Sequence, residues 1–589
     1  MVKFMKNSRL LRFVLAVFGL FAFISFVNYG NELRAQSAEP SSSDSDEVEK
    51  YQLGPDSQPQ AGVPKGKTFS FQYEDSKIYP GTIHTISVYV PAEYRGDNPA
   101  CVYMGIGKLN FNVPVVFDNL IYKHEMPVTI AIGVSAGIVR SADKKENPRF
   151  NRSFEFDSLN DSLARFITEE IFPAVETHKT PDGLPIKLSR DPNDHCAGGA
   201  STPGIAAFTL AWERPDLFRR VFTAVGTFVC MRGGDRYPVL VRETEPKPIR
   251  VFQQDGSNDE WPGGPEVGDW WMSNQTLERA LEFAGYDHQH VWGTGKHNAN
   301  QADAIFPDAM RYLWKDWPKP VLAQAAKTQN VTLQATIDPN SSWQLVSDTG
   351  NTCDNLAVNF RGEIFFHDLA AGRTRDLNTN GIIGDEPAIA ADKAFAFAGD
   401  GRAITAPDFN AACLTVTSKG YVYATDAEAG KVWLIKPDGT KTSLDEGLNG
   451  PTGIALSPDN LWLVVMENRT HFGYSYRVLA DGTVDCKERI YWAHVPDWAD
   501  DSGAGSMCMD RDGYLYVATR MGVQIFDRNG RSRAILPMPT GEATSVCFGG
   551  AKFDTLFVIS GGQLYKRHMK AIGAPAFEAP IKLPDSGPG

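Results

Sequence analysis

A strand–turn–strand pattern recurs along the chain after about residue 340, and it constrains the fold more than any other feature. An apolar strand leads into an Asp-Gly or Asn-Gly turn at 432–439, 474–482, 509–513 and 522–530. Units of this kind return every 40 to 50 residues or so, the period of propeller blades. About 240 residues at that period predict five or six blades. Short hairpins would also suit a β-sandwich, but the period favours a propeller.

The preceding residues, 68–318, show a different pattern of apolar residues. Residues 68–73 and 85–90 alternate with a period of two, as half-buried antiparallel strands do. Residues 128–134 are continuously apolar, which is typical of a central strand covered on both faces. Helical spacing follows at 158–171, where Pro173 is expected to end or kink the helix, and at 277–284. Alternating strands and helices predict a mostly parallel α/β sheet.

The N-terminus has the layout of an export signal. Four basic residues up to Arg12 precede an uncharged apolar run at 13–27, and the polar stretch 33–38 follows. This is the arrangement of a secretory signal peptide, and the run is short for a membrane span. We therefore expect a signal peptide at 1–37, cleaved between Ala35 and Ala38, and a secreted or periplasmic protein with no stable membrane span. An uncleaved N-terminal anchor is the alternative interpretation.

The remaining boundaries follow from composition. Residues 38–67 are rich in Ser, Asp, Glu, Gln and Pro and predict a solvated linker. A second linker is expected at 319–339, a propeller at 340–575 and a tail at 576–589. The formal charge of −13 and the absence of a long basic stripe argue against a nucleic-acid partner. The eight cysteines are scattered without a C-x-x-C motif, which does not indicate a disulfide scaffold.

The segment from Gly198 to Gly204 predicts a nucleophile elbow around Ser201. Small residues allow the sharp strand-to-helix turn that exposes a serine Oγ, and a helix-compatible apolar run follows. The N–H of Thr202 would then help to bind an oxyanion. Pro203 occupies the place of the second glycine and disfavours helical geometry at Thr202, although proline is tolerated in the first turn of a helix.

Two later strand ends supply the partners of such a serine. Residues 249–259 form an apolar strand running into a turn that ends at Asp259, and residues 290–298 repeat this design with His297 in the turn. The order Ser, Asp, His is that of α/β hydrolases. We assign Ser201 as nucleophile, His297 as general base and Asp259 as the acid that orients the histidine. Asp255 is a rival acid, and His288, His290 and His297 can each be read as ordinary structural histidines.

Residues 51–318 resemble the enterochelin-esterase-like branch of the α/β hydrolases, in its exported bacterial form. The resemblance rests on stretches 113–120, 149–155, 232–234, 247–259 and 305–308. It implies that Ser201, Asp259 and His297 are catalytic, with no cofactor required. The chain departs from the family pattern at Pro203 and at 104–107, where a Gln-Asp-Gly type sequence and the second oxyanion donor are expected.

Residues 340–570 look like the six-bladed propeller of the gluconolactonase and regucalcin family, on stretches 359–366, 499–504 and 518–522. The resemblance implies a calcium or zinc ion on the propeller axis, held by one Glu, two Asn and one Asp. The register places Asp354, Ala412, Thr452 and Gly505 at these positions, so only Asp354 offers a carboxylate. We expect the metal and its lactonase chemistry to be lost. Asp500 and Asp501 are possible substitutes, although acids at a blade edge usually belong to a solvated turn.

The resulting hypothesis is an exported serine hydrolase that cleaves a carboxylic ester of a small molecule or carbohydrate, with a propeller used for binding or scaffolding. Four residues are candidates for substrate contact: Arg232, Trp261, Trp270 and Trp271. The tryptophans can equally be packing residues, and Arg232 can be a surface ion-pair partner. The alternatives are a metal-dependent lactonase acting through Asp354 in the propeller, and an inactive binding protein.

Overall fold

The computed structural model describes residues 51–143, 145–259, 266–347, 352–386, 389–390 and 393–584. The predicted signal peptide and the first part of the predicted linker lie outside these residues. Within the described ranges, no helix is long and apolar enough to cross a membrane.

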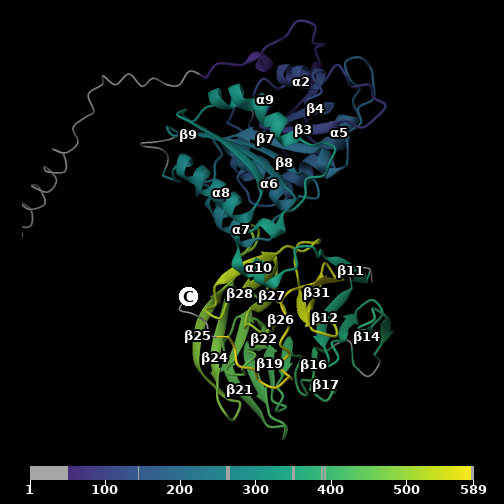
Figure 1. Cartoon of the computed structure of the whole chain (residues 1–589), viewed down its shortest axis with the longest axis vertical. Coiled ribbons are helices and arrows are strands. Elements are labelled where there is room, and N and C mark those ends of the chain that lie inside the picture. Colours follow the sequence, from purple (N-terminus) through teal and green to yellow (C-terminus); the bar gives the residue numbers. More distant parts are fainter. Residues whose placement is uncertain are drawn as a thin grey trace, which may run out of the picture. The chain divides into compact units, whose positions relative to one another are not determined.

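The first domain is built on one eight-stranded sheet in the order β1-β2-β4-β3-β7-β8-β9-β10. Figure 1 labels its strands β3, β4, β7, β8 and β9. The pairs β1–β2 and β2–β4 are antiparallel, and every pair from β4 to β10 is parallel. The mostly parallel sheet predicted from the sequence is thus confirmed. The strands are β1 (Lys67–Tyr73), β2 (His84–Val90), β3 (Cys101–Ile106), β4 (Thr129–Val134), β7 (His195–Ala200), β8 (Arg220–Ala224), β9 (Arg250–Gly256) and β10 (Asp287–Gly293). A separate small hairpin joins β5 (Ile138–Val139) to β6 (Arg149–Phe150).

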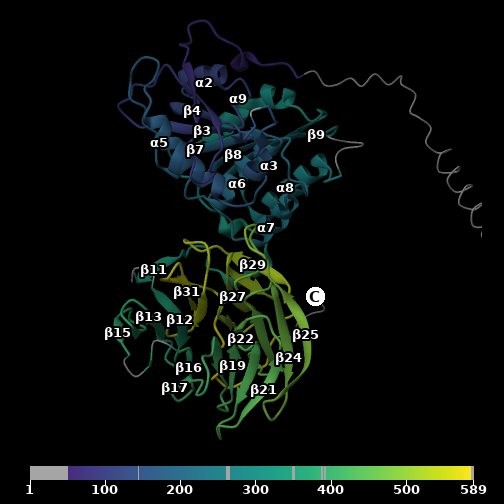
Figure 2. The ribbon, with the colours of Figure 1, turned by 180° about the vertical axis from the view of Figure 1, so that it is seen from behind.

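Helices cover both faces of this sheet, as the two views in Figures 1 and 2 show. One apolar core joins the sheet to α2 (Val113–Tyr122) and α9 (Asn300–Trp314). The other core joins it to α6 (Thr202–Glu213), α7 (Tyr237–Glu243) and α8 (Trp270–Ala284). The central strands β3 and β4 are buried along their whole length, since both faces are covered. The short helix α3 (Arg152–Phe156) precedes the longer helical segment of this second layer.

That segment starts later than predicted and continues past Pro173. It begins at α4 (Ser162–Arg165), widens into a π-helical turn at Phe166–Ile171 and continues as α5 (Phe172–Glu176). Pro173 therefore does not end the helix, because it lies directly after the widened turn, where its missing N–H breaks no regular ladder. The helix predicted at 277–284 is likewise longer and starts at Trp270.

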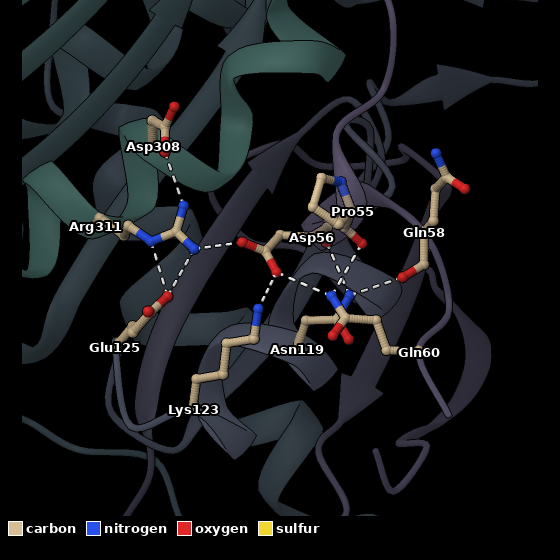
Figure 3. Close-up of polar contacts among 9 residues, drawn as sticks. All are labelled: Pro55, Asp56, Gln58, Gln60, Asn119, Lys123, Glu125, Asp308 and Arg311. Atoms are coloured by element: carbon tan, nitrogen blue, oxygen red, sulfur yellow. Dashed lines mark hydrogen bonds and ion pairs between the residues drawn. The ribbon is translucent and has the colours of Figure 1, made fainter. Parts of the chain in front are cut away.

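The described part of the first predicted linker packs against the domain. Asp56 bonds to Lys123, which directly follows α2, and to Arg311 of α9, and Arg311 also pairs with Glu125 at 2.7 Å (Figure 3). The Asn119 amide donates to the carbonyl oxygens of Asp56 and Gln58, both at 2.9 Å. Burial opposes ionisation, but the bonds from Lys123 and Arg311 hold the pKa of Asp56 below its usual value. This strap fixes α2 to α9 on one face of the sheet.

The second domain is a propeller of six sheets within the described residues. Five sheets have four strands and one has two, and the first strands of neighbouring sheets contact one another in a closed ring. The two-stranded sheet is β16 (Phe395–Phe397) with β17 (Ala403–Thr405). The others are β12 (Cys353–Val358), β13 (Ile364–Asp368), β14 (Arg373–Leu377) and β15 (Ile383–Asp385); β18 (Cys413–Val416), β19 (Val422–Asp426), β20 (Lys431–Ile435) and β21 (Lys441–Glu446); β22 (Pro451–Leu456), β23 (Trp462–Glu467), β24 (Phe472–Val478) and β25 (Val484–Trp492); β26 (Met507–Met509), β27 (Leu515–Thr519), β28 (Gly522–Phe526) and β29 (Ser532–Leu536); and β30 (Ser545–Gly549), β31 (Thr555–Ser560) and β32 (Gln563–His568) with β11 (Gln344–Ser347).

The ring is closed by chain segments from its two ends. Strand β11 pairs antiparallel with β32, so the start and end of the propeller share one sheet. The helix α10 (Val331–Thr336) precedes β11 within the second predicted linker, and its Leu333 is fully buried. The propeller predicted from the turn pattern is confirmed, with one reduced blade.

Polar contacts join α7 and the residues after it to the propeller. Glu245 accepts two hydrogen bonds from the buried Arg567 guanidinium, at 2.6 and 2.7 Å. The Glu243 carboxylate accepts a hydrogen bond from the Ser532 hydroxyl at 2.7 Å, and its Oε2 lies 3.0 Å from His494 Nε2. Paired charges of this kind hold a defined geometry because unpairing either partner leaves a buried charge.

Candidate active site

Ser201 stands at the turn between β7 and α6 in a conformation that non-glycine residues seldom adopt. Its φ is 65° and its ψ is −130°. The Ser201 N–H donates to the Ala224 carbonyl of β8 at 2.9 Å, and the Gly204 N–H donates to the Ser201 carbonyl at 2.7 Å. Such a strained turn persists only where its surroundings enforce it, and it directs the side chain outward above the sheet.

The glycines of this segment are required by close packing. A Cβ at Gly199 would lie 2.4 Å from the Pro203 carbonyl oxygen, and one at Gly204 would lie 2.8 Å from the Thr223 hydroxyl. Pro203 itself occupies the first turn of α6, where an N–H has no acceptor within the helix. The structure therefore accommodates Pro203 while the strained backbone of Ser201 is retained.

The turns after β9 and β10 lie directly against each other. A Cβ at Gly256 would meet the backbone of Gly295 at 2.3 Å, which requires glycine there. The N–H groups of Ser257 and Asn258 donate to the carbonyl groups of Gly293 and Gly295, at 2.9 and 3.2 Å. Since β9 and β10 are parallel neighbours, this packing brings the two turns to one edge of the sheet.

The structure brings Ser201, His297 and Asp259 into one hydrogen-bonded chain. His297 Nε2 lies 2.8 Å from Ser201 Oγ, and His297 Nδ1 lies 2.6 Å from Asp259 Oδ1. A carboxylate can only accept at Nδ1, so Nδ1 carries the proton and Nε2 is free to accept from the serine. Asp259 is fully buried, whereas the His297 side chain is 23% exposed. This arrangement can transfer a proton between a serine and an incoming group.

Asp255, the rival acid, is also fully buried and lies beside Asp259. Burial, the charge of Asp259 and a hydrogen bond with it raise the pKa of Asp255 well above its usual value. Two adjacent buried carboxyl groups do not both ionise, so Asp255 keeps its proton and donates it to Asp259. Asp255 Oδ2 and Asp259 Oδ2 have no other partner among the described residues, which this shared proton explains.

Asn274 of α8 completes the surroundings of this acid pair. Its amide nitrogen donates to the carbonyl groups of Gly226 and Trp270, at 2.8 and 3.0 Å. The orientation of the amide is thereby fixed, and Asn274 lies beside Asp255, so α8 borders the acid pair. The sequence reasoning did not single out Asn274. The available signal was its position on the apolar stripe of a helix, four residues after Trp270 and three before Leu277.

Thr227 is a second residue that the sequence reasoning missed. Its hydroxyl lies 3.4 Å from Ser201 Oγ and accepts from the Trp270 indole N–H at 3.2 Å. The Trp270 ring also meets the His297 ring edge to face at 5.5 Å. A lone threonine after a strand carries no sequence signal for this role.

Thr202 and the loop after β3 meet at the elbow. Thr202 is buried and starts α6, so its N–H lacks an intrahelical acceptor. Gly107 lies against Pro203, since a Cβ there would be 3.3 Å from the Pro203 ring. The Gly107 N–H donates to Val134, whereas the N–H of Lys108 has no acceptor among the described residues. Thr202, at the elbow, and Lys108, next to Gly107, therefore each carry a backbone N–H without an internal acceptor among the described residues.

The four candidate substrate residues have different surroundings. Trp270 is buried and packs on His297 and Thr227, and Trp271 packs edge to face on Trp292 at 5.3 Å. Arg232 is exposed and lies 5.9 Å from the centre of the Phe154 ring. Trp261 lies outside the described residues. The structure thus places Trp270 next to the histidine and gives Trp271 a packing partner.

The centre of the propeller is apolar. A hollow of about 120 Å³ is lined by the first strands of the six sheets and by residues 574–577, and the lining contains no Asp or Glu. Asp354 Oδ1 accepts the N–H of Asn355 at 2.8 Å, and the Thr452 hydroxyl donates to the Ala504 carbonyl. A calcium ion needs six to eight oxygen ligands, including carboxylates, and this set does not fit one. Zinc would require nitrogen or sulfur ligands that the four expected positions lack.

Two family models match the chain. The family described as "Putative esterase" matches residues 79–357, and the family described as "SMP-30/Gluconolactonase/LRE-like region" matches residues 330–562. This chain unites an esterase-family domain with a gluconolactonase-like propeller. Both resemblances drawn from the sequence are confirmed at the level of the family.

Two curated relatives match the chain over part of their own length. A pentonolactonase, XacC, of Haloferax volcanii is 25% identical over 27% of this chain and 60% of the relative. A gluconolactonase of Zymomonas mobilis is 26% identical over 24% of this chain and 41% of the relative. The chain therefore spans less than two thirds of either protein.

Solved structures match each half of the chain. The enterobactin esterase Fes of Shigella flexneri is 15% identical over 44% of this chain and 61% of its own, with a TM-score of 0.32. A ferulic acid esterase is 16% identical over 43% of this chain and 98% of its own, with a TM-score of 0.31. A gluconolactonase of Xanthomonas campestris is 21% identical over 40% of this chain and 92% of its own, with a TM-score of 0.35.

Proposed function

We propose that the first domain is a serine hydrolase that cleaves a carboxylic ester. Ser201 Oγ attacks the ester carbonyl carbon while its proton passes to His297 Nε2. The same proton then leaves with the alcohol, and the acyl group stays on Ser201. Water, deprotonated by His297, releases the acid and restores the serine. Asp259 orients the imidazole and stabilises its charged form.

The observation that carries this proposal is the hydrogen-bonded chain at 2.8 and 2.6 Å, joined to a serine held at a φ of 65°. A serine and a histidine can meet by chance on a surface, but a strained elbow and a buried acid do not accompany such a pair without cause. Membership of the esterase family supports the same chemistry.

Oxyanion stabilisation is assigned to backbone donors. The N–H groups of Thr202 and Lys108 have no internal acceptor among the described residues, and Gly107, next to Lys108, packs against Pro203. Donors of this type stabilise the tetrahedral intermediate, and removing one commonly costs a factor of about 10² to 10³ in turnover. We assign the second donor to Lys108, which follows the departure at 104–107.

The propeller is assigned a binding or scaffolding role. Its axis offers no set of carboxylates for a hard cation, so metal-dependent lactonase chemistry is not assigned to it. The substrate is expected to be an ester of a small molecule or a carbohydrate. The N-terminal signal pattern at 1–37 supports export to the periplasm or beyond.

Hydrolysis of short-chain p-nitrophenyl esters tests the proposal. Ser201→Ala should lower the rate by a factor on the order of 10⁴ or more, since the triad acts as a unit, and a chelator should leave it unchanged. Ser443→Ala, at a half-buried serine of the propeller strand β21, is the matched control. Chelator-sensitive activity that survives Ser201→Ala would move the chemistry to the propeller. No hydrolysis by the unaltered chain would favour a binding protein.

A further inference from the structure

A second group of side chains with ligand chemistry lies between α8 and β10, apart from the three residues of the triad. Glu278 projects from α8, and His288 and His290 project from β10. The two histidines are two residues apart on a strand, so they share the face that meets the helix. Their side-chain ligand atoms and a Glu278 oxygen lie within 4.8 Å of one another.

The distances fit a shared ion better than two direct ion pairs. His288 Nε2 lies 3.3 Å and His290 Nδ1 lies 3.5 Å from the same oxygen, Glu278 Oε1. Charge-assisted N–H···O contacts are shorter, about 2.7 to 2.9 Å. Ligands at about 2.0 to 2.1 Å around a tetrahedral zinc ion are spaced by roughly 3.3 to 3.4 Å. These two spacings match those of ligands arranged around an ion, and all three ligand atoms lie within 4.8 Å of one another.

The surroundings prepare these groups for coordination. His288 Nδ1 lies 3.2 Å from the Tyr286 carbonyl oxygen, which can only accept, so Nδ1 carries a proton and Nε2 presents a lone pair toward Glu278. The Glu278 side chain is 9% exposed, whereas that of His290 is 38% exposed. The site therefore has one buried ligand, Glu278, and is open to solvent at His290.

The open side leads to a hollow of about 390 Å³ lined by Glu278, Glu282, Arg279, Gln275, His290 and Trp292. Trp292 stacks on His290 with ring centres 4.7 Å apart, which holds the imidazole in place. Arg279 is the nearby positive charge, 3.8 Å from Glu278, but it is largely exposed and pairs with Glu282 at 2.7 Å. Water can occupy a fourth position from this hollow.

We propose that Glu278, His288 and His290 bind one divalent transition-metal ion of the zinc class. Two imidazoles and one carboxylate suit zinc and its neighbours, whereas calcium and magnesium require oxygen ligands alone. The bound ion joins the edge strand β10 to α8. These two elements lead to His297 and carry Trp270, but none of the three ligands belongs to the triad, so the ion holds β10 to α8 without taking part in the proposed hydrolysis.

Titration of the full, untagged chain with Zn²⁺ after removal of metal by a chelator tests this site. We expect one tight site per chain that Mg²⁺ does not compete for. Glu278→Gln, which keeps both histidines, should weaken binding at least about tenfold, and His290→Ala should do the same. The matched control His568→Gln, an exposed histidine 4.0 Å from Asp554, should bind as the unaltered chain does.

Two outcomes would overturn the proposal. One is equal Zn²⁺ affinity in Glu278→Gln and the unaltered chain, which would indicate ordinary surface binding by histidines. The other is a Co²⁺ complex of the unaltered chain that lacks the visible absorption of a four-coordinate ion, a measurement that needs no variant to fold. Ser201→Ala should bind Zn²⁺ unchanged, so this test is independent of the proposed esterase activity.

Discussion

The acid pair beneath His297 gives the sharpest prediction about the site. Asp255 donates its retained proton to the buried Asp259 carboxylate, and replacing it with alanine removes that donor. A hydrogen bond to a charged group contributes about 1.5 to 3 kcal/mol, so the oriented state of Asp259 should lose roughly ten- to 150-fold in population. We expect kcat/KM of Asp255→Ala to fall by that factor.

Asparagine at the same position provides the matched comparison. Its amide keeps the shape of Asp255 and supplies two N–H groups, one for Asp259 and one for the Asn274 amide oxygen, which has no partner among the described residues. Asp255→Asn should therefore retain kcat/KM within about fivefold, because a neutral donor replaces a neutral donor. Its pH–rate profile should match that of the unaltered chain.

The assay is p-nitrophenyl acetate hydrolysis across the pH range, with circular dichroism to confirm that each variant is folded. The expected results follow from an uncharged Asp255 in the working site. If it were charged, asparagine would remove a negative charge beside the triad and move the acid limb of the profile to lower pH by about one to three units. Such a shift, or equal losses in the two variants, would refute the assignment.

Three further predictions concern the frame of the site. Pro203→Gly should leave kcat/KM within about threefold and lower stability by about 0.4 to 1 kcal/mol, since glycine adds freedom to the unfolded chain; a tenfold gain in rate would instead mean that Pro203 distorts the elbow. Burial opposes ionisation of Asp287, but bonds from Lys315 and Tyr312 lower its pKa to about 2. Asp287→Asn should therefore cost about 2 kcal/mol of stability above pH 3.8, and in urea unfolding experiments this difference should shrink below pH 3.8 and disappear as the pH falls through 2. Thr227→Val should lower stability by about 1 to 3 kcal/mol, because it leaves the Trp270 indole N–H without its acceptor. Thr227→Ser keeps the hydroxyl and should not lower stability. Equal melting temperatures for Thr227→Val and the unaltered chain would contradict this account.

Much of the fold could be predicted because its signals are local. Continuous apolar strands, helical spacing and Asp-Gly turns reflect burial and backbone geometry over a few residues, and they identified both architectures. The course of the helix through Pro173 was not predicted, because a π-helical turn depends on how neighbouring side chains pack. The packing of the strap around Asp56 rests on partners more than 60 residues away, Lys123 and Arg311.

The candidate site shows the same division. Chain order and strand ends placed Ser201, Asp259 and His297 together, but they left Asp255 and Asp259 as rivals. The choice depends on how the turns at Gly256 and Gly295 interlock, which only three-dimensional packing determines. Thr227 and Asn274 act through hydrogen bonds that include partners more than 25 residues away along the chain, and such contacts leave no periodic pattern.

Covalent labelling of the serine tests the central claim most directly. A fluorophosphonate ester reacts with a serine only when a base activates it, and mass spectrometry of the digested protein identifies the labelled residue. The account predicts one adduct per chain, on Ser201, with parallel loss of ester hydrolysis, no adduct in Ser201→Ala and much slower labelling in His297→Ala. An adduct on another residue, or full hydrolysis after stoichiometric labelling of Ser201, would contradict it.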